Sequence, residues 1–395
     1  MFRSFGRLLP PLGWIILAAA LTLTLLGVLS IYAGEAGPDV RPARTYRQLA
    51  FLAVGLGGFL LIQLLGYRRF ADWAYPLLAL MLILLGLLII AQKVPMAPLI
   101  VPRRDAYRWL ALGPVSIQVS ECAKLAHILA MAAYLRYRTN YRTFRGLLMP
   151  FALTLIPTAL ILKEPDLGTS ILLLPTLFVM LYAAGARGWH LLLIMLLGAA
   201  AAPAFYFSPF MHDYQRRRVQ ALFRQAEADP RWRINEGYQL NQSKIALGSG
   251  GWFGQGFRGG AFFRYNLLPE DHNDFIFAML GHQWGFVGCL VTLLGYLLII
   301  VASFTIASMT TDPFGRLVAV GIAALLAAQT LINIYMTMGL APVTGMSLPF
   351  VSLGGSGLVV NYLSIGLVCD VARRRPISMA PRPFEFVEEE DDDAA

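Results

Sequence analysis

Charged residues are scarce in this chain. Asp, Glu, Lys and Arg make up 14% of its 395 residues, whereas they make up about 25% of a typical soluble domain. Hydrophobic residues account for 57% of the sequence, and the mean hydropathy is +0.61. These values exclude an ordinary soluble domain and predict a protein that crosses a membrane several times.

Signatures of metal sites, disulfide frameworks and nucleotide domains are also missing. The three cysteines, Cys122, Cys289 and Cys369, lie in apolar stretches without paired spacing, and no histidine occurs in an H-E-x-x-H pattern. A G-x-G-x-x-G at 254–259 has no strand before it, and the chain contains no Walker motif. We therefore predict no protein metal site and no nucleic-acid partner. Whether a divalent cation assists the protein stays open at this point.

Long apolar runs, by contrast, are abundant. A helix needs roughly 20 apolar residues to cross the hydrocarbon core, where it satisfies its own backbone hydrogen bonds. We predict an all-α polytopic membrane domain over residues 1–375, with one large extracytoplasmic loop, 208–272, between spans 7 and 8. A cytoplasmic acidic tail at 376–395 is predicted to be disordered. About ten spans are predicted, near 12–33, 48–66, 74–92, 118–135, 146–162, 167–185, 188–207, 273–304, 314–338 and 350–371.

Basic residues predict the orientation of these spans, because short cytoplasmic loops carry an excess of Lys and Arg. With a cytoplasmic N-terminus, the inside loops contain Arg68, Arg69, Arg136, Arg138, Arg142, Arg145, Arg187, Arg316 and Arg373 to Arg375. An even number of spans returns the C-terminus to the same side. The loop 208–272 follows the seventh span, so it faces outward. The first apolar run is too long for the core of a cleaved signal peptide, so we predict an uncleaved first helix.

Asp274 stands where a polar loop, LPEDHND, becomes a long apolar run. Asn and Asp at such a boundary often accept hydrogen bonds from the first free N–H groups of a helix. A carboxylate at the surface of a membrane protein can alternatively act as a general base. The position alone supports both interpretations.

Three more acidic or basic residues lie at the starts of predicted spans. Glu121 and Lys124 are three residues apart, so they face the same side of a helix and are expected to pair. Ionisable residues at membrane depth are costly, which favours a functional role, although a structural salt bridge also fits. Asp166, in the loop sequence KEPDLG, is predicted to cap the sixth span.

The predicted outward loops are more basic than the orientation rule requires. A segment at 214–228 has the pattern of a basic amphipathic helix on the membrane surface. Guanidinium groups bind diphosphates in forked geometry, so an anionic ligand is one explanation, and contact with solvent or lipid headgroups is the other. The outward basic residues are Arg41, Arg44, Arg47, Lys93, Arg103, Arg104, Arg108, Arg216, Arg217, Arg218 and Arg224.

The sequence APVTGMSLPFVSLGGSG at 341–357 places prolines and glycines at membrane depth. Lipid cannot satisfy the backbone groups that such residues free, so the segment must be buried in protein or line a cavity. We predict a re-entrant or cavity-lining turn.

Four separated stretches, RWLALGP with SECAK, YQLNQSKIALGSGG, LPEDHNDFIF and APVTGMSLPFVSLGGSG, together resemble the SEDS family of RodA and FtsW proteins. The resemblance implies a bacterial inner-membrane glycosyltransferase that polymerises lipid II at the outer face of the membrane and releases undecaprenyl pyrophosphate. It also implies a class B penicillin-binding protein as partner, besides the membrane lipids. The role in cell elongation or in cell division stays open.

Carried over by motif, the resemblance implies that Asp274 is catalytic. The substrate-binding residues that it implies are Arg108, Glu121, Lys124, Gln242, Ser243, Lys244, His272, Thr344 and Ser352. In such a reaction one carboxylate accepts the proton of a sugar hydroxyl, and cations stabilise the departing pyrophosphate.

The chain departs from the family pattern at four positions: Val119 replaces a proline, His282 and Gln283 replace an acidic pair, and Leu353 replaces a tyrosine. Two other functions also fit a polytopic bundle with a buried Glu–Lys pair and broken helices. One is a lipid flippase or transporter, and the other is a non-catalytic scaffold for the cross-linking enzyme.

Overall fold

The structure is a computed structural model of the whole chain. It describes residues 9–35, 42–92, 94, 100, 107–112, 115–208, 211, 213–226, 237–265, 267, 268 and 272–374. The predicted acidic tail at 376–395 lies outside the described residues, as do Arg41, Lys93, Arg103, Arg104 and Arg375.

Each of the ten predicted spans coincides with a long helix in the described part of the chain. The helices are α2 (Pro11–Gly34), α3 (Ala43–Leu65), α4 (Arg69–Ala91), α5 (Val119–Leu135), α6 (Phe144–Lys163), α7 (Leu167–Ala184), α8 (Gly188–Phe207), α13 (Ile276–Ser308), α14 (Pro313–Met338) and α15 (Gly355–Arg374). By length and composition, 8 of them can cross a membrane; α5 has 17 residues, and the apolar part of α8 covers Gly188–Ala204. The helical membrane fold is confirmed, whereas the number of crossings stays a prediction.

Side-chain caps fix the starts of several helices. Asp166 accepts a hydrogen bond from the Thr169 amide at the start of α7, which confirms its predicted role as a cap. Asp312 caps α14 in the same way, with Pro313 at the first helical position, where its missing N–H costs nothing.

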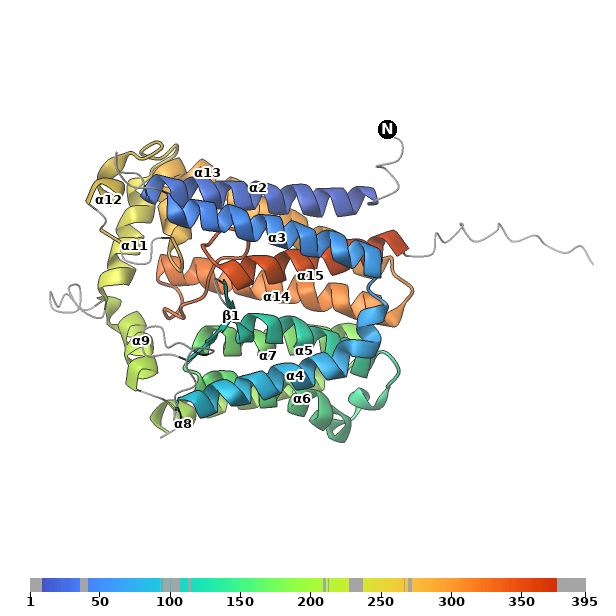
Figure 1. Cartoon of the computed structure of the whole chain (residues 1–395). Helices are drawn as coiled ribbons and strands as arrows, with labels where there is room; N and C mark the ends of the chain where they lie inside the picture. The colour runs from blue at the N-terminus through green and yellow to red at the C-terminus, as the bar shows by residue number, and fades with distance from the viewer. Residues whose placement is uncertain are drawn as a thin grey trace, which may run out of the picture.

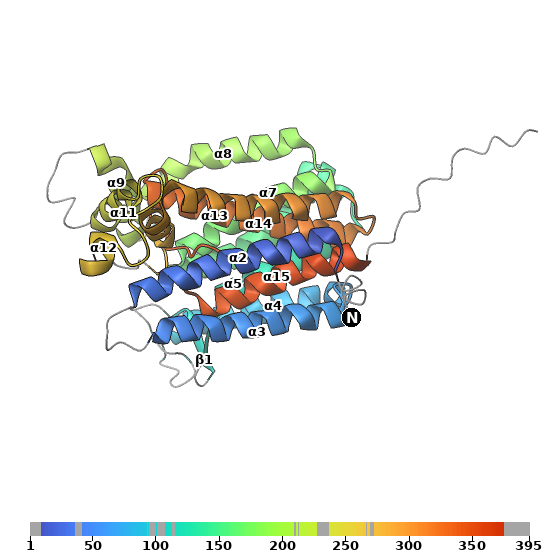
Figure 2. The same cartoon turned by 90° about the horizontal axis from the view of Figure 1, so that it is seen from above.

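The helices form one bundle with α14 near its centre. In the most apolar window of α14, 78% of the residues are buried, against 28% in α3 and in α4. Helix α15 packs along α3, α13 along α2 and α14, and α4 along α5. Figures 1 and 2 show α9, α11 and α12 gathered at one end of the bundle. The start of α2 and the end of α15 lie at the opposite end, as an even number of spans requires (Figure 1).

The segment 208–272 is largely helical in its described parts. It contains α9 (Asp213–Phe223), the 3₁₀ turn η2 (Arg224–Ala226), α11 (Tyr238–Ser249) and α12 (Gly260–Tyr265). The predicted amphipathic helix at 214–228 therefore ends as an α-helix at Phe223, and residues 227 and 228 lie outside the described part. Helix α11 packs against α13 and α14, so this segment is part of the bundle rather than a free loop.

Helix α13 differs from the uninterrupted span predicted for it. It begins at Ile276 and is broken at Gly285, whose backbone has φ 64° and ψ −158°. The glycine-rich turn after α11 bonds to this break: the Gln255 amide donates to the His282 carbonyl, and the Phe286 amide donates to the Gly251 carbonyl. Gly254 approaches so closely that an added Cβ would lie 2.2 Å from the Gln283 carbonyl oxygen.

Two further segments are not helical. A short antiparallel hairpin joins β1 (Trp109–Leu112) to β2 (Val115–Gln118), an element that the sequence did not predict. After α14 the chain turns at Gly339, which is left-handed with φ 78°, and stays irregular up to α15. This irregular segment, 339–354, agrees with the predicted cavity-lining turn.

Candidate active-site cavity

A cavity of about 390 Å³ opens among α3, β1, β2, α5, α7, α9, α14, the irregular segment 339–354 and the start of α15. Its lining is strongly charged, with basic and acidic groups interspersed. The charged residues that line it are Arg47, Arg108, Glu121, Lys124, Asp166, Arg218 and Asp274. Such a lining suits a polar, anionic ligand better than an apolar one.

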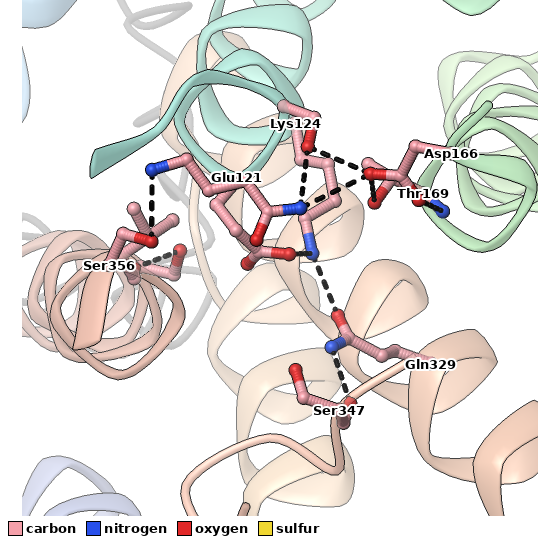
Figure 3. Close-up of polar contacts among 11 residues, drawn as sticks. Glu121, Lys124, Asp166, Thr169, Gln329, Ser347 and Ser356 are labelled. Atoms are coloured by element: carbon pink, nitrogen blue, oxygen red, sulfur yellow. Dashed lines mark hydrogen bonds and ion pairs between the residues drawn. The ribbon is translucent and has the colours of Figure 1, made fainter. Parts of the chain in front are cut away.

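At one wall of the cavity, Glu121 and Lys124 form the pair that their spacing predicts. The Lys124 ammonium donates to Glu121 Oε1 at 2.9 Å and to Gln329 Oε1 at 3.1 Å, and the Gln329 amide donates to the Ser347 carbonyl at 2.9 Å (Figure 3). This chain of bonds ties α5 and α14 to the irregular segment. Glu121 Oε2 is buried without a hydrogen-bond partner, so it can accept a hydrogen bond from a ligand.

The turn between α6 and α7 forms another wall. Besides capping α7, the Asp166 carboxylate accepts hydrogen bonds from Ser120 Oγ at 3.0 Å and from Gln118 Nε2 at 3.2 Å (Figure 3). Arg108 donates to the carbonyls of Glu164 and Pro165, at 2.8 and 2.6 Å. Arg108 therefore holds the turn and the hairpin together while it lines the cavity.

Asp274 lines the cavity and is partly buried. The capping interpretation would place it at the N-cap of α13, but Phe275 occupies that position and makes no side-chain cap bond. The backbone carbonyl of Asp274 accepts a hydrogen bond from Asn333 Nδ2 at 3.0 Å. The two carbonyls before it are held in the same way, His272 by the Leu353 amide at 2.9 Å and Asn273 by Ser352 Oγ at 2.6 Å.

Three consecutive carbonyls of the Asp274 loop are thus bonded to α14 or to the irregular segment. This arrangement fixes the backbone that carries the carboxylate, which is the preorganisation that a catalytic group needs.

Arg218 reaches the cavity from α9 and lies beside Asp274. A Cβ added to Gly345 would be 3.1 Å from Arg218 Nη1 and 3.6 Å from Asp274 Oδ2, so both charged groups flank this glycine. Burial lowers the pKa of the Arg218 guanidinium, while the nearby Asp274 carboxylate acts to raise it. Arginine stays protonated in proteins, so a cation faces the carboxylate.

The predicted site residues divide into two groups. Five line the cavity: Arg108, Glu121, Lys124, Asp274 and Thr344. The other five, Gln242, Ser243, Lys244, His272 and Ser352, do not line it.

Several residues of the second group support the site or its surroundings. Ser352 and the His272 backbone hold the Asp274 loop, and Ser243 Oγ donates to the Thr337 carbonyl at 2.9 Å. Lys244 is exposed and donates to Gln225 Oε1 at 3.1 Å. Gln242 lies on α11, outside the lining. A substrate-binding role for these five residues stays a prediction.

Sequence reasoning missed Gln329 and Asn333 and did not place Asp166 or Arg218 in the cavity. Gln329 and Asn333 had a usable signal, because they are polar residues within an apolar helix and therefore need partners there. For Asp166, capping already explained the residue type. Arg218 was one of many outward basic residues for which an anionic ligand was one explanation, and nothing in the sequence singled it out from them.

The departures from the family pattern lie mainly away from this cavity. His282 Nδ1 is 2.6 Å from Ser249 Oγ, and Gln283 Oε1 accepts a bond from Ser30 Oγ at 3.1 Å. Neither residue lines the cavity, whereas Leu353 does. Val119 is buried at the start of α5.

The long apolar helices and the charged cavity define a class of protein, namely a polytopic helical membrane protein with a polar site between its helices. Residues 12–376 match the FtsW, RodA and SpoVE family, which is described as cell cycle proteins. The chain belongs to this family, and the resemblance seen in its motifs is confirmed.

Relatives with curated names are similar over nearly the full length. The peptidoglycan glycosyltransferase MrdB of Escherichia coli K12 is 35% identical over 368 residues, 93% of this chain and 94% of that protein. The probable peptidoglycan glycosyltransferase FtsW of Trichlorobacter lovleyi is 33% identical over 371 residues, 91% and 92% of the two chains.

Solved structures agree with these matches. A chain from a structure titled as a peptidoglycan synthase complex that coordinates polymerization and crosslinking has a TM-score of 0.76 and 30% identity, with 91% of this chain and 97% of that chain covered. The rod shape determining protein RodA of Thermus thermophilus has a TM-score of 0.66 and 28% identity, with 92% and 97% covered.

Proposed function

We propose that this protein is a peptidoglycan glycosyltransferase that polymerises lipid II into glycan strands and releases undecaprenyl pyrophosphate. The observation that carries the proposal is the cavity, whose lining includes the Asp274 carboxylate together with four cations from three helices and from the segment before β1. Membership of the family and the names of the relatives support the same activity.

The proposed chemistry uses these groups in separate roles. Asp274 accepts the proton of the acceptor sugar hydroxyl while that oxygen bonds to the anomeric carbon of the donor. The bond from that carbon to the diphosphate breaks, and its electron pair leaves with undecaprenyl pyrophosphate. Arg47, Arg108, Lys124 and Arg218 supply the positive charge that stabilises the departing diphosphate. Thr344 lines the same cavity and is proposed to contact the substrate.

A divalent cation is proposed only as an assistant that enters with the substrate. The described residues contain no group of three or more His, Cys, Asp or Glu that could hold a metal. A diphosphate itself binds Mg²⁺ through its oxygens. Polymerisation measured with EDTA and with added Mg²⁺ tests this role, and a rate that is equal in both conditions would contradict it.

The test of the function is direct. Purified protein is incubated with lipid II, and the product is separated on a gel: we expect a ladder of glycan polymer that lysozyme digests. A protein that makes no polymer but moves lipid II across proteoliposome membranes would be a flippase. A protein that does neither would act as a scaffold.

The proposed environment is the bacterial cytoplasmic membrane, with both termini cytoplasmic and the cavity facing outward. The end of the bundle that carries α9, α11 and α12 would then lie outside (Figure 1). We expect alkaline phosphatase to be inactive when fused after Ala395 and active when inserted near Asp229. The reverse pattern would overturn the outward placement of Asp274.

The proposed partner is a class B penicillin-binding protein. A solved structure similar to this chain comes from a complex that couples polymerization to crosslinking. Co-purification of the chain with each such transpeptidase of the same cell would identify the partner and so decide between elongation and division.

A further inference from the structure

Helix α9 brings one arginine into the cavity and leaves its neighbour in solvent. Arg218 lines the cavity, whereas Arg217, the preceding residue, is exposed. The 3₁₀ turn η2 that follows α9 is fastened nearby, because Gln225 Nε2 donates to the Gly339 carbonyl at 2.9 Å. Arg218 is therefore placed over the cavity by a helix that is anchored to the irregular segment.

The charges around Arg218 come from three other elements. Asp274 before α13 and Asp166 before α7 attract its guanidinium, whereas Arg108 before β1 repels it. Burial adds to the cost of keeping this cation without a partner. Of the two acids, Asp274 has the larger effect on the Arg218 guanidinium, and it flanks Gly345 together with Arg218.

Gly345 leaves room for the Arg218 guanidinium and the Asp274 carboxylate to lie close together. It has φ +76°, a left-handed conformation that favours glycine, and it presents no side chain between the guanidinium and the carboxylate. A guanidinium binds a carboxylate or a phosphate through the same forked set of N–H donors. A diphosphate carries more negative charge than one carboxylate, so it can compete for that fork.

We propose that Arg218 exchanges partners: it pairs with Asp274 in the empty cavity and moves to the diphosphate of the substrate when the cavity is filled. The exchange rests on the proposed function. While Arg218 faces Asp274, the carboxylate form is stabilised and is a weak base. Once the diphosphate takes the guanidinium, Asp274 loses its cation and becomes the stronger base that proton abstraction requires. Substrate binding itself then switches on the catalytic base.

The test compares Arg218→Gln with Arg217→Gln, which removes the same charge from the adjacent, exposed position. The rate of lipid II polymerisation is measured against pH, and inorganic pyrophosphate serves as a competing anion. The pH dependence of kcat/KM reports groups of the free enzyme, and that of kcat reports groups of the complex.

For Arg218→Gln we expect two changes together. Inhibition by inorganic pyrophosphate weakens roughly 10-fold or more, since a charge-assisted bond is lost. The acid limb of kcat/KM moves to higher pH by about one unit, because the free enzyme loses the cation beside its base, whereas the acid limb of kcat keeps its position. Arg217→Gln changes neither quantity, and Arg218→Lys, which keeps the charge without the fork, gives intermediate values.

Each of the other outcomes contradicts the exchange. Weaker pyrophosphate inhibition without a shift of the limb would make Arg218 a phosphate ligand only. A shifted limb with unchanged inhibition would make it a partner of Asp274 only. If the wild-type protein forms no polymer, the proposed function fails; calorimetric binding of inorganic pyrophosphate then still compares Arg218→Gln with wild type, and equal affinities would overturn the exchange.

Discussion

Two aspartates lie near opposite ends of the bundle, each close to the end of a long apolar helix, and their surroundings differ. Asp370, in the last turn of α15, is fully buried and satisfied by the protein: its carboxylate accepts a bond from the Tyr67 amide at 2.7 Å and pairs with Arg373 at 3.0 Å and Arg374 at 2.9 Å. Asp274 lines a cavity, and its carboxylate flanks Gly345 together with the guanidinium of Arg218.

The difference shows how the same residue type serves two purposes in one membrane protein. The Asp370 carboxylate, whose partners all belong to the protein, joins α15 to the turn between α3 and α4 and is not available to a ligand. The Asp274 carboxylate, whose backbone is fixed, lines a cavity that is large enough for a ligand. Substitutions of these and neighbouring carboxyl groups test this contrast.

The Glu121–Lys124 pair is both a buried structural ion pair and part of the cavity wall, so its removal should have the largest effect. Glu121→Ala or Lys124→Ala leaves the partner charge buried at the cavity wall, which costs roughly 3–5 kcal/mol for a buried pair. We expect each single variant to lose polymerisation almost completely, and the exchanged pair Glu121→Lys with Lys124→Glu to retain more of it. Lipid II polymerisation at normal rates by both Ala variants would rule out a role for the pair.

Asp370→Asn should reduce stability without affecting the chemistry. The variant loses its ion pairs with Arg373 and Arg374, and we expect a cost of about 3 kcal/mol, at the low end for a buried pair because both arginines are partly exposed. Thermal unfolding in detergent measures this loss. The rate per folded molecule should stay at the wild-type value, and a fall in that rate would remove the contrast with Asp274.

Glu164 is another buried carboxyl, in the turn between α6 and α7, and neither of its oxygens has a hydrogen-bond partner. Burial, with the neighbouring Asp166 charge, raises its pKa from 4.5 to about 9, against the opposing effect of Arg108. The folded protein therefore holds a proton that the unfolded chain releases above about pH 4.5. Stability falls as the pH rises from about 4.5 to about 9.

Glu164→Gln removes this titration, so the variant should match wild type near pH 4 and be more stable above it. If the wild-type turn did not relax, the variant would gain about 1.4 kcal/mol in free energy of unfolding for each pH unit above the unfolded-state pKa. Relaxation of the turn should reduce this gain to about 2 kcal/mol at pH 7. Unfolding temperatures of both proteins across this pH range measure the gain. A constant difference between the two curves would show that Glu164 is not protonated in the fold.

Much of this architecture was predictable because its causes are local. Apolar runs long enough to cross a bilayer define the ten helices, a three-residue spacing predicts the Glu121–Lys124 pair, and the position before Leu167 predicts the Asp166 cap. Prolines and glycines at membrane depth likewise predicted the irregular segment.

The remaining features depend on contacts between distant parts of the chain. The break at Gly285 is stabilised by backbone bonds from the turn at 251–256, which no local pattern reveals. The hairpin β1–β2 is only four residues deep on each side, too short for a periodic signal. Arg218 has the sequence context of a surface helix, and only the fold shows that it enters the cavity beside Asp274.

The most direct test of the account is Asp274→Asn, with Asp370→Asn as its matched control. Asparagine keeps nearly the same shape and a hydrogen-bond acceptor but removes the basicity. We expect Asp274→Asn to fold, insert and bind lipid II nearly as wild type does, and to polymerise it at least about 100-fold more slowly, the typical cost of losing a general base. Polymerisation by this variant within a few-fold of the wild-type rate would contradict the assignment of Asp274 as the catalytic base.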